Sequence, residues 1–566
     1  MNRKILSLLL ALVMALTVPF ALAEETAEQD WGAEDYRIRA DYRTELADSY
    51  EGKTVILHSN DVHGELLGYA YIAGLRDLFI DRGADVLLVD SGDFSQGNIY
   101  VSSSKGLAAI EMMNAAAYDV VTLGNHEFDF GYDQLMDNLK QASFAAICAN
   151  VTLNDADNMT ILAPAHVTET QHGLKLGFVG VETPETRTKV NPGLIANLTF
   201  AVHEDMQKLT QAAVDSIREE CDLVFGLFHL GVENDAKPDG NRSIDLLDKV
   251  TGIDFTLDAH GHTQMTEGQH GERIQSTGTK FANVGVVVID NENKTIEDHF
   301  LIPTHIHSPL YTFNYINQAV KEKAEEIIQK VDQEFGASFA TTDVTLNGER
   351  ADNRSVETNM GDLITDAIIW FVNKDGGIQL ANPSLIVSIV NGGAIRATIQ
   401  PGEISRKDIK SVLPYGNTVA VIYVTGEELL EALEASTFST PETTGGYPQT
   451  SGFEWTIDTT KPYDQGTLYV LDGKESTYYA PASINRVSIT AVNGQPFDPK
   501  TTYAVVTNDF LAAGGDTYNV FGRSITRFDT GVPLDEAVVA YINEVLDGRI
   551  TKEAYGSPRN SVTQIK

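Results

Sequence analysis

Gly124-Asn125-His126-Glu127-Phe128-Asp129 is the stretch of sequence that most reduces the number of possible folds for this chain. It follows an apolar run over residues 118–123 that has the character of a buried strand. An amide, an imidazole and two carboxylates therefore stand where a strand passes into a loop. Ligands of open α/β sheets bind at this edge, but the same residue types are also common in turns. The hexapeptide alone leaves a ligand site and a capped turn open.

Four further strand-like runs end in residues that can bind a metal ion. They are the runs over 54–60, 85–92, 222–228 and 254–259, followed by Asp61 and His63, by Asp93, by His229, and by the segment 260–264. Any one of these could be a chance arrangement, but five at corresponding strand ends predict a shared site. Mixed oxygen and imidazole ligands suit Zn²⁺, Mn²⁺ or Fe²⁺ rather than a thiolate-bound structural zinc.

The length of 566 residues predicts two domains rather than one core. Apolar runs alternate with helix-like segments up to about residue 290, which favours a layered α/β domain. Apolar residues recur at helical spacing over 314–335, and a second α+β region follows. We expect a signal peptide over 1–23, an extension over 24–50, a first domain over 51–310, a linker helix over 311–340 and a second domain over 341–566.

The N-terminus and the charge predict an exported protein. A basic segment, Asn2-Arg3-Lys4, precedes an apolar stretch over 5–16 and the cleavage-site pattern Ala21-Leu22-Ala23. We therefore expect a secreted, extracellular, periplasmic or cell-surface protein without membrane insertion, monomeric by default. The net charge of −39 argues against nucleic acid polymers as partners. Cys148 and Cys221 lie beside apolar runs, so we expect buried free thiols, with one bridge as the alternative.

The strand-end motifs together resemble the calcineurin-like metallophosphoesterases. The chain carries, in order, D-x-H at 61–63, G-D-x(3)-G at 92–97, G-N-H-E at 124–127, a lone His229, and G-H-x-Q at 261–264. The last form and the full G-N-H-E-F-D resemble the 5′-nucleotidase branch. The resemblance implies two divalent ions, Zn²⁺, Mn²⁺ or similar. It implies Asp61, His63 and Gln264 on one ion, Asn125, His229 and His262 on the other, and Asp93 between them.

The G-H-x-Q motif allows two alignments. His260-x-His262 could be the H-x-H of the wider family, but Gly261 matches the glycine that precedes His262 in G-H-x-Q. We favour His262 and Gln264 as ligands, which makes His260 a neighbouring residue. Two divalent ions carry about four positive charges and two aspartate ligands cancel two of them. The remaining positive charge suits a phosphate dianion despite the acidic surface.

The remaining polar residues of the opening motif predict a catalytic pair. His126 and Asp129 are three residues apart, a spacing that lets a carboxylate reach an imidazole within one turn. We expect Asp129 to orient His126 and to stabilise its charged form. A structural hydrogen bond that caps the loop is the alternative. We expect Glu127 to be structural.

The second domain carries arginines, aromatic residues and glycine turns that a phosphatase core does not explain. Arginine presents a planar fork to phosphate or carboxylate, and stacking on an aromatic ring stabilises a bound base by about 1–3 kcal/mol. Taken singly, the arginines could pair with surface acids and the aromatic residues could pack in a core. The residues alone leave both interpretations open.

Four motifs of this region resemble the C-terminal domain of secreted bacterial 5′-nucleotidases, of the periplasmic UDP-sugar hydrolase/5′-nucleotidase type. They are E-T-N-M-G at 357–361, N-G-G-x-I-R at 391–396, L-P-[FY]-G-N at 413–417 and N-x-F-x(3)-G-G-D at 508–516. The resemblance implies that Tyr415 and Phe510 sandwich a base and that Asn417 binds its edge. It implies Asp516 and Gly445 at the ribose, and Asn391, Arg350, Arg354 and Arg396 among the other substrate contacts. The family usually has Phe at position 415, and a phenol ring still stacks.

The resemblance covers about residues 52–545 and implies a fold of class α/β (α+β). We expect an N-terminal four-layer αββα calcineurin-like metallophosphatase domain, a linker helix and a C-terminal α+β substrate-binding domain. The expected function is release of phosphate from nucleoside 5′-phosphates such as AMP, and also ADP or ATP, by attack of a hydroxide that the two ions supply. The alternatives are a 2′,3′-cyclic-nucleotide phosphodiesterase/3′-nucleotidase, a UDP-sugar hydrolase, a catalytically silent nucleotide-binding surface protein and a purely structural one.

Overall fold

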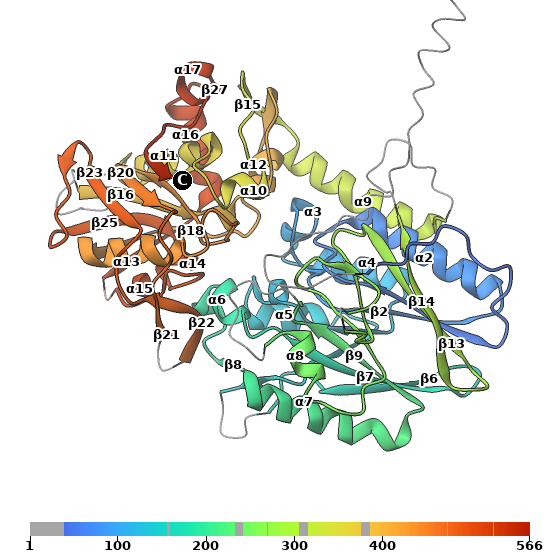
Figure 1. Cartoon of the computed structure of the whole chain (residues 1–566). Helices are drawn as coiled ribbons and strands as arrows, with labels where there is room; N and C mark the ends of the chain where they lie inside the picture. Colours follow the sequence, from blue (N-terminus) through green and yellow to red (C-terminus); the bar gives the residue numbers. More distant parts are fainter. Residues whose placement is uncertain are drawn as a thin grey trace, which may run out of the picture.

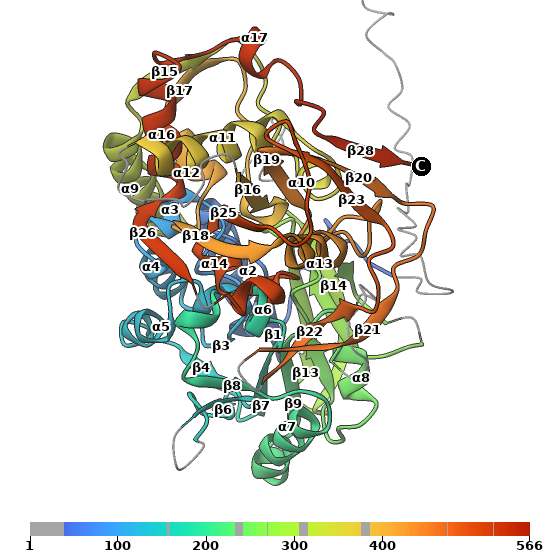
Figure 2. The same ribbon diagram turned by 90° about the vertical axis from the view of Figure 1, so that its left-hand side faces the viewer.

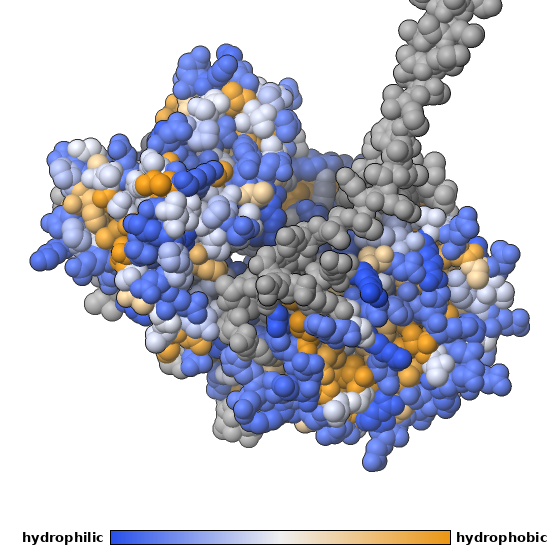
Figure 3. All heavy atoms as spheres, viewed as in Figure 1, coloured by the Kyte–Doolittle hydropathy of each residue, from blue (hydrophilic) through white to orange (hydrophobic). Residues whose placement is uncertain are grey.

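The computed structural model describes residues 39–154, 159–232, 241–268, 270–304, 315–374, 385–471, 474–524 and 526–566 (Figure 1). The expected signal peptide and the first part of the expected extension lie outside these ranges. In the described ranges no helix has the length and apolar character needed to span a membrane. Both domains present a largely hydrophilic face with scattered apolar patches in the view of Figure 3.

The N-terminal domain is built on two six-stranded sheets. The first has the order β14-β13-β1-β2-β3-β4 and the second the order β11-β12-β10-β9-β7-β6. The first consists of β1 (Lys53–Ser59), β2 (Asp85–Asp90), β3 (Val120–Thr122), β4 (Ala145–Ile147), β13 (Asn283–Asp290) and β14 (Thr295–Pro303). The second consists of β6 (Ala165–Glu169), β7 (Lys175–Glu182), β9 (Leu223–His229), β10 (Phe255–Leu257), β11 (Gln264–Met265) and β12 (Ile274–Thr277).

Alternation along the strands explains how the two sheets pack. Ile56 of β1 joins a buried cluster with Phe178 and Phe225 of the second sheet. Its neighbours Val55 and Leu57 point the other way and pack against helices, because successive strand residues face opposite sides. Strands buried on both faces read as continuous apolar runs, which is the pattern that the sequence has here.

Helices cover the outer face of each sheet. On the first sheet lie α2 (Leu66–Asp81), α4 (Leu107–Ala116) and α9 (Gln318–Phe335). On the second lie α7 (His203–Ile217) and α8 (Ser243–Leu247). The domain is therefore the expected four-layer αββα structure. Cys148 and Cys221 are both buried and free, as expected.

Helix α9 occupies the expected linker. Its N-cap is Asn317, whose side chain accepts a hydrogen bond of 3.1 Å from the backbone of Val320. Val320 and Ala324 are buried in the core of the N-terminal domain, so the helix packs as part of that domain. Near its end, Asp332 forms an ion pair of 2.5 Å with Lys407 of the C-terminal domain.

The C-terminal domain has a central mixed sheet of order β19-β16-β25-β18-β26. Its strands are β16 (Ile386–Asn391), β18 (Thr418–Thr425), β19 (Pro448–Ser451), β25 (Thr502–Asn508) and β26 (Arg527–Pro533). One face packs on α11 (Asn359–Lys374), α12 (Arg406–Val412) and α16 (Leu534–Glu544). The other packs on α13 (Gly426–Ser436), α14 (Asp509–Ala512) and the strands β20 (Phe453–Asp458) and β23 (Val487–Val492). Figure 2 shows this α+β arrangement from the side.

Smaller strands complete this domain. A three-stranded sheet joins β15 (Ser338–Thr342), β17 (Gly402–Ser405) and β27 (Arg549–Ile550), and β24 (Gln495–Pro496) and β28 (Val562–Ile565) flank β23 and β20. The hairpin of β21 (Gln465–Leu471) and β22 (Lys474–Pro481) extends towards the N-terminal domain (Figures 1 and 2).

The imidazole of His58 in β1 predicts a loss of stability in acid. The side chain is fully buried opposite Gly285 of β13, and burial, partly opposed by Gln275, lowers its pKa to about 4. An unfolded histidine titrates near pH 6.5. Between pH 6.5 and pH 4 the unfolded state therefore binds a proton at this histidine, whereas the native state does not. We expect stability present above pH 6.5 to be lost as the pH falls towards 4, by about 3 kcal/mol in total.

Urea unfolding of the chelator-treated protein between pH 7.5 and pH 4 measures this effect. Carboxylates also titrate in this range, so the reference is His58→Gln, which keeps the volume and cannot be protonated. The free energy of unfolding should fall more steeply with acid in the unmodified protein than in the variant. Parallel curves would contradict the prediction.

Candidate active site

The strand ends of both sheets bring the expected ligands together. Asp61 and His63 follow β1, Asp93 follows β2, and Asn125 begins the short 3-10 helix Asn125–Phe128 after β3. From the second sheet, β9 ends at His229, and the loop after β10 carries His260 and His262. All of these except His260 and His262 are almost fully buried.

Short distances join the carboxylates and imidazoles. Nε2 of His63 lies 3.0 Å from Nε2 of His262 and 3.8 Å from Oδ2 of Asp93. Nε2 of His229 lies 3.2 Å from the same Asp93 oxygen, and Nε2 of His262 lies 3.6 Å from Oδ1 of Asp61. Asp93 therefore stands between two groups of possible ligands, and its role as a bridging ligand stays a prediction.

The donor set fits divalent ions. Nδ1 of His229 faces the carbonyl of Ser91 at 2.7 Å, and Nδ1 of His63 faces the carbonyl of Gln96 at 3.2 Å. A proton on each Nδ1 leaves each Nε2 available to a metal ion, which is how metal-binding histidines are usually held. Oδ1 of Asn125 is buried and has no hydrogen-bond partner among the residues that the structure describes. An unpaired buried oxygen costs about 1–3 kcal/mol, and a cation would offset that cost.

The electrostatics also call for a cation. Burial, reinforced by Asp93 and opposed by His229, raises the pKa of Asp61 to about 8. A neighbouring carboxylate disfavours ionisation of a buried one unless a positive charge compensates it. Asp61 is therefore largely protonated at neutral pH in the protein alone, and a divalent ion would supply the positive charge that lets it ionise.

The ligand loops hold strained backbone. Asp61, His63, Asp93, His260 and His262 all adopt positive φ, from 47° to 75°. Such conformations cost of order 1–3 kcal/mol for each residue and persist where the surroundings impose them. Their concentration in the ligand loops indicates that the fold imposes the positions of these side chains.

Glu127 supports this geometry in a way that the sequence did not reveal. Its buried carboxylate accepts backbone hydrogen bonds from Gly124 (2.6 Å) and Asp93 (2.8 Å), and from Phe94 and Ser95 (both 2.9 Å). It therefore ties the loop after β2 to the loop after β3. Burial first, then Asp93, raises the pKa of Glu127 to about 7, and the backbone donors oppose this. The structural role expected for Glu127 is therefore to hold the two ligand loops together.

The expected pair of His126 and Asp129 is formed. Nδ1 of His126 donates to Oδ2 of Asp129 at 2.7 Å, and both side chains are mostly buried. Burial alone would lower the pKa of His126, but Asp129 and Asp93 outweigh it and raise the pKa to about 10. His126 therefore carries a positive charge beside the candidate metal centre, where its ring centroid lies 5.3 Å from that of His63.

Gln264 and His260 have partners that the sequence did not indicate. Oε1 of Gln264 accepts hydrogen bonds from Tyr42 (2.9 Å) and Asn283 (3.0 Å), so its role as a ligand stays a prediction. Nε2 of His260 lies 3.2 Å from Oε2 of Glu185. A ring nitrogen of His260 also lies close enough to Asp93 and His229 for the three to form a further possible ligand set. The division of the ligands between two ions also stays a prediction.

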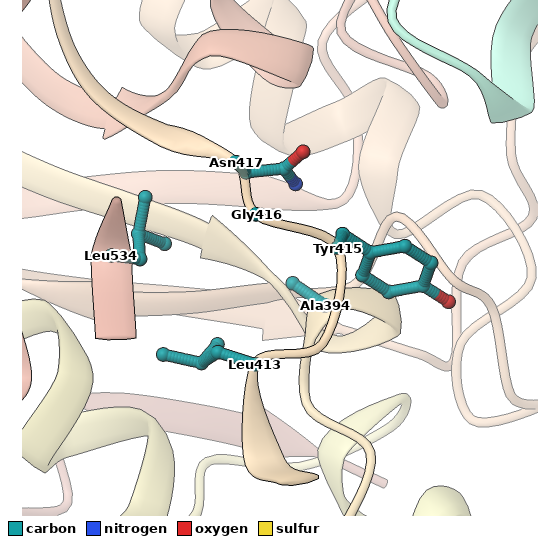
Figure 4. Close-up of a pocket in the computed structure, with 6 residues that line it drawn as sticks. All are labelled: Ala394, Leu413, Tyr415, Gly416, Asn417 and Leu534. Atoms are coloured by element: carbon teal, nitrogen blue, oxygen red, sulfur yellow. The ribbon is translucent and has the colours of Figure 1, made fainter. Parts of the chain in front are cut away.

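Tyr415 of the C-terminal domain reaches the candidate metal centre. Its ring stacks on His126, with centroids 5.8 Å apart and an angle of 24° between the planes. The guanidinium of Arg396 lies 5.7 Å from the centroid of the Tyr415 ring. Figure 4 shows Tyr415 and Asn417 on one side of their loop and Leu413 and Leu534 on the other. Tyr415 and Arg396, two of the expected substrate-binding residues, therefore lie on the side of the C-terminal domain that faces His126.

The three expected arginines influence one another. Burial, together with repulsion from Arg350 and Arg396, lowers the pKa of Arg354 to about 9. Within the described ranges, Nε of Arg354 is buried and has no hydrogen-bond partner. The charges of Arg350 and Arg396 also act on His262 of the candidate metal centre. The arginines thus form a cationic cluster beside that centre, which is the electrostatic complement of a phosphate.

Asn391, Gly445 and Asp516 lie together. Nδ2 of Asn391 donates to Asp516 at 2.9 Å, and a Cβ on Gly445 would lie 3.6 Å from both carboxylate oxygens. Phe510 is packed in the core cluster between the central sheet and α13, and its ring touches Gly515. Among the described residues no ring contact joins Phe510 to Tyr415, so their sandwich around a base stays a prediction.

The αββα fold and the carboxylate–imidazole cluster at its strand ends define a calcineurin-like, metal-dependent phosphoesterase. Residues 54–264 match the family model described as calcineurin-like phosphoesterase, and residues 338–523 match that of the 5′-nucleotidase C-terminal domain. The chain belongs to the 5′-nucleotidase family, which joins these two domains, and it is a metal-dependent phosphoester hydrolase.

Proteins similar to this chain carry matching names. A 5′-nucleotidase of Rattus norvegicus is 28% identical over 547 residues, which are 88% of this chain and 90% of that protein. The trifunctional nucleotide phosphoesterase protein YfkN of Bacillus subtilis is 27% identical over 84% of this chain, which spans only 33% of that protein. The solved structure of a 5′-nucleotidase precursor from Thermus thermophilus has a TM-score of 0.70 at 26% identity, covering 91% of this chain and 99% of that one.

Proposed function

We propose that this protein is an exported 5′-nucleotidase that releases phosphate from nucleoside 5′-monophosphates such as AMP, with ADP and ATP as further substrates. The observation that carries the proposal is the contact between Tyr415 and His126. It places a ring able to stack on a base beside a charged imidazole of the candidate metal centre. A nucleotide can therefore touch both domains at once, with its phosphate at the strand ends.

Each group of the site has a task in this reaction. Two divalent ions bound by the Asp61, Asp93 and His229 cluster would polarise the phosphate and activate a water. The water oxygen bonds to phosphorus, and the bond from phosphorus to the 5′ oxygen breaks. His126, held charged by Asp129, stabilises the phosphoryl oxygens or gives its proton to the departing 5′ oxygen. Arg354 and its neighbours balance the charge of the phosphate.

Contacts to the base and the ribose determine which phosphate esters are substrates. Tyr415 and Phe510 hold the base and Asn417 binds its edge, while Asp516 and Gly445 accept the ribose. The relatives named 5′-nucleotidase support this assignment. The basic segment, the apolar stretch and the small residues at 21–23 support export through a signal peptide.

Phosphate release from a panel of substrates tests the proposal. AMP, UDP-glucose, 3′-AMP and 2′,3′-cyclic AMP are each assayed with Mn²⁺ or Zn²⁺ and with EDTA. We expect AMP to be hydrolysed fastest and EDTA to abolish the reaction until metal is restored. Hydrolysis of none of the four would remove the enzymatic proposal, and preference for 3′-AMP or the cyclic nucleotide would redirect it to that substrate class.

A further inference from the structure

A short helix of the N-terminal domain is fixed to the C-terminal domain. Helix α6 (Thr186–Lys189) follows β7 and lies beside β22 in both ribbon views (Figures 1 and 2). The carbonyl of Thr188 accepts the backbone N–H of Asp516 at 2.6 Å. The Thr188 hydroxyl lies 2.8 Å from that of Thr477, and Asn191 donates to Asp509 at 2.8 Å. Helix α6 therefore lies directly against the loop that carries Asp516.

Lys189, at the end of α6, is held between two groups of the C-terminal domain. Its Nζ lies 2.5 Å from the hydroxyl of Tyr478 and 3.4 Å from Oδ1 of Asp516. The lysine side chain is only 26% exposed and that of Asp516 only 5%. Burial alone would lower the pKa of Lys189, but Tyr478, Asp516 and Glu185 raise it. A permanent cation from one domain therefore lies against a carboxylate of the other.

The Asp516 carboxylate is also held from its own domain. Its Oδ2 accepts from Asn391 at 2.9 Å, and Asn391 in turn accepts from Asn508 at 3.0 Å. Each oxygen of Asp516 thus has a partner from a different domain: Oδ2 has the amide of Asn391 in the C-terminal domain, and Oδ1 has Lys189 of the N-terminal domain. The rotamer of this carboxylate depends on both.

We propose that Lys189 is a positioning residue for the carboxylate that binds the ribose, so that the sugar is recognised only when the two domains are docked through α6. The inference rests on the proposed nucleotide function. A ribose diol needs both oxygens of Asp516 in fixed places. Without Lys189 the carboxylate keeps Asn391 as its side-chain partner among the described residues, and the contact between α6 and β22 loses its charged side chain. A phosphate ester without a ribose does not use Asp516 and should not depend on Lys189.

Steady-state kinetics of Lys189→Met and Lys189→Arg with AMP and with p-nitrophenyl phosphate test this inference. The loss of one hydrogen bond to a charged group should raise KM for AMP about tenfold in Lys189→Met. We expect kcat for AMP and both constants for p-nitrophenyl phosphate to stay within about twofold of the unmodified enzyme. Lys189→Arg keeps the charge and should recover part of the loss. Lys208→Met is the matched control, because Lys208 is exposed and its ion pairs in the described part of the chain are with Glu204 and Asp205 of its own helix.

Hydrogen exchange supplies a readout that is independent of turnover. The backbone of Asp516 and of residues 476–479 should exchange faster in Lys189→Met than in the Lys208→Met control. Equal losses with AMP and p-nitrophenyl phosphate would indicate a general structural role, and an unchanged or lower KM for AMP would exclude positioning; either result overturns the inference. Failure of the unmodified enzyme to hydrolyse AMP, with p-nitrophenyl phosphate still hydrolysed, would instead remove the proposed function, and this inference with it.

Discussion

An Asp93→Asn variant is expected to lose at least about a hundredfold in phosphate release from AMP and from p-nitrophenyl phosphate, together with bound metal. Substitution of residues that merely support metal ligands costs about 10–100-fold in metal affinity or activity. Asp93 is itself a candidate ligand, so the loss should be at least as large. Its Oδ2 is 3.2 Å from His229 and 3.8 Å from His63. An amide keeps the shape of this side chain but lacks the negative charge that the proposed bridge between two divalent ions requires.

The local fold should survive this change. Asn tolerates left-handed backbone better than most residues, and Asp93 has φ of 63°. The backbone N–H of residue 93 would still donate to Glu127. Metal content by mass spectrometry and the thermal midpoint of the chelator-treated protein separate the two effects. Asp137→Asn, at an exposed ion pair with Lys140, is the control. A variant with its full metal content and activity would contradict a bridging role for Asp93.

The ligand cluster could be predicted because it follows from local rules. Each apolar run identified a strand, and the residue after it had to lie at the carboxyl edge of a sheet. Asp61, Asp93 and His229 therefore meet although more than a hundred residues separate the first from the last. The pair of His126 and Asp129 could be predicted for a similar reason, since three residues span one turn.

The supporting contacts could not be predicted, because they join segments whose approach no local pattern encodes. The carboxylate of Glu127 folds back to the loop after β2, more than 30 residues earlier in the chain. The hydrogen bond of Tyr42 to Gln264 crosses 222 positions. The stacking of Tyr415 on His126 depends on how two domains are placed, and the burial of Phe510 depends on how a whole core is packed. The residue types at these positions restrict the possible partners without selecting one.

A His126→Ala variant is expected to lose about 10²–10⁴-fold in kcat for AMP, the range of a positioned acid or base, while it keeps its metal. Asp129→Asn should lose less, and the double variant should be no slower than His126→Ala alone, because Asp129 acts through His126. Its Oδ2 lies 2.7 Å from Nδ1 of His126, and it is the largest contributor to the raised pKa of that imidazole. Groups that act as one unit give such non-additive losses. Additive losses in the double variant would show that the two residues act separately.

The choice of substrate decides between the two roles left to His126. The 5′ oxygen of AMP is a poor leaving group and needs a proton as it departs, whereas p-nitrophenolate departs without one. If His126 supplies that proton, His126→Ala should be far slower with AMP and only slightly slower with p-nitrophenyl phosphate. If the charged imidazole instead stabilises the phosphoryl oxygens, both substrates should lose alike, because the phosphoryl group is the same. The pairing with Asp129 keeps the proton on His126 at neutral pH in either case, and the proximity of Nδ1 to Asp129 leaves only Nε2 to face the substrate. We therefore expect the AMP-selective loss, and equal losses would assign His126 to charge stabilisation alone.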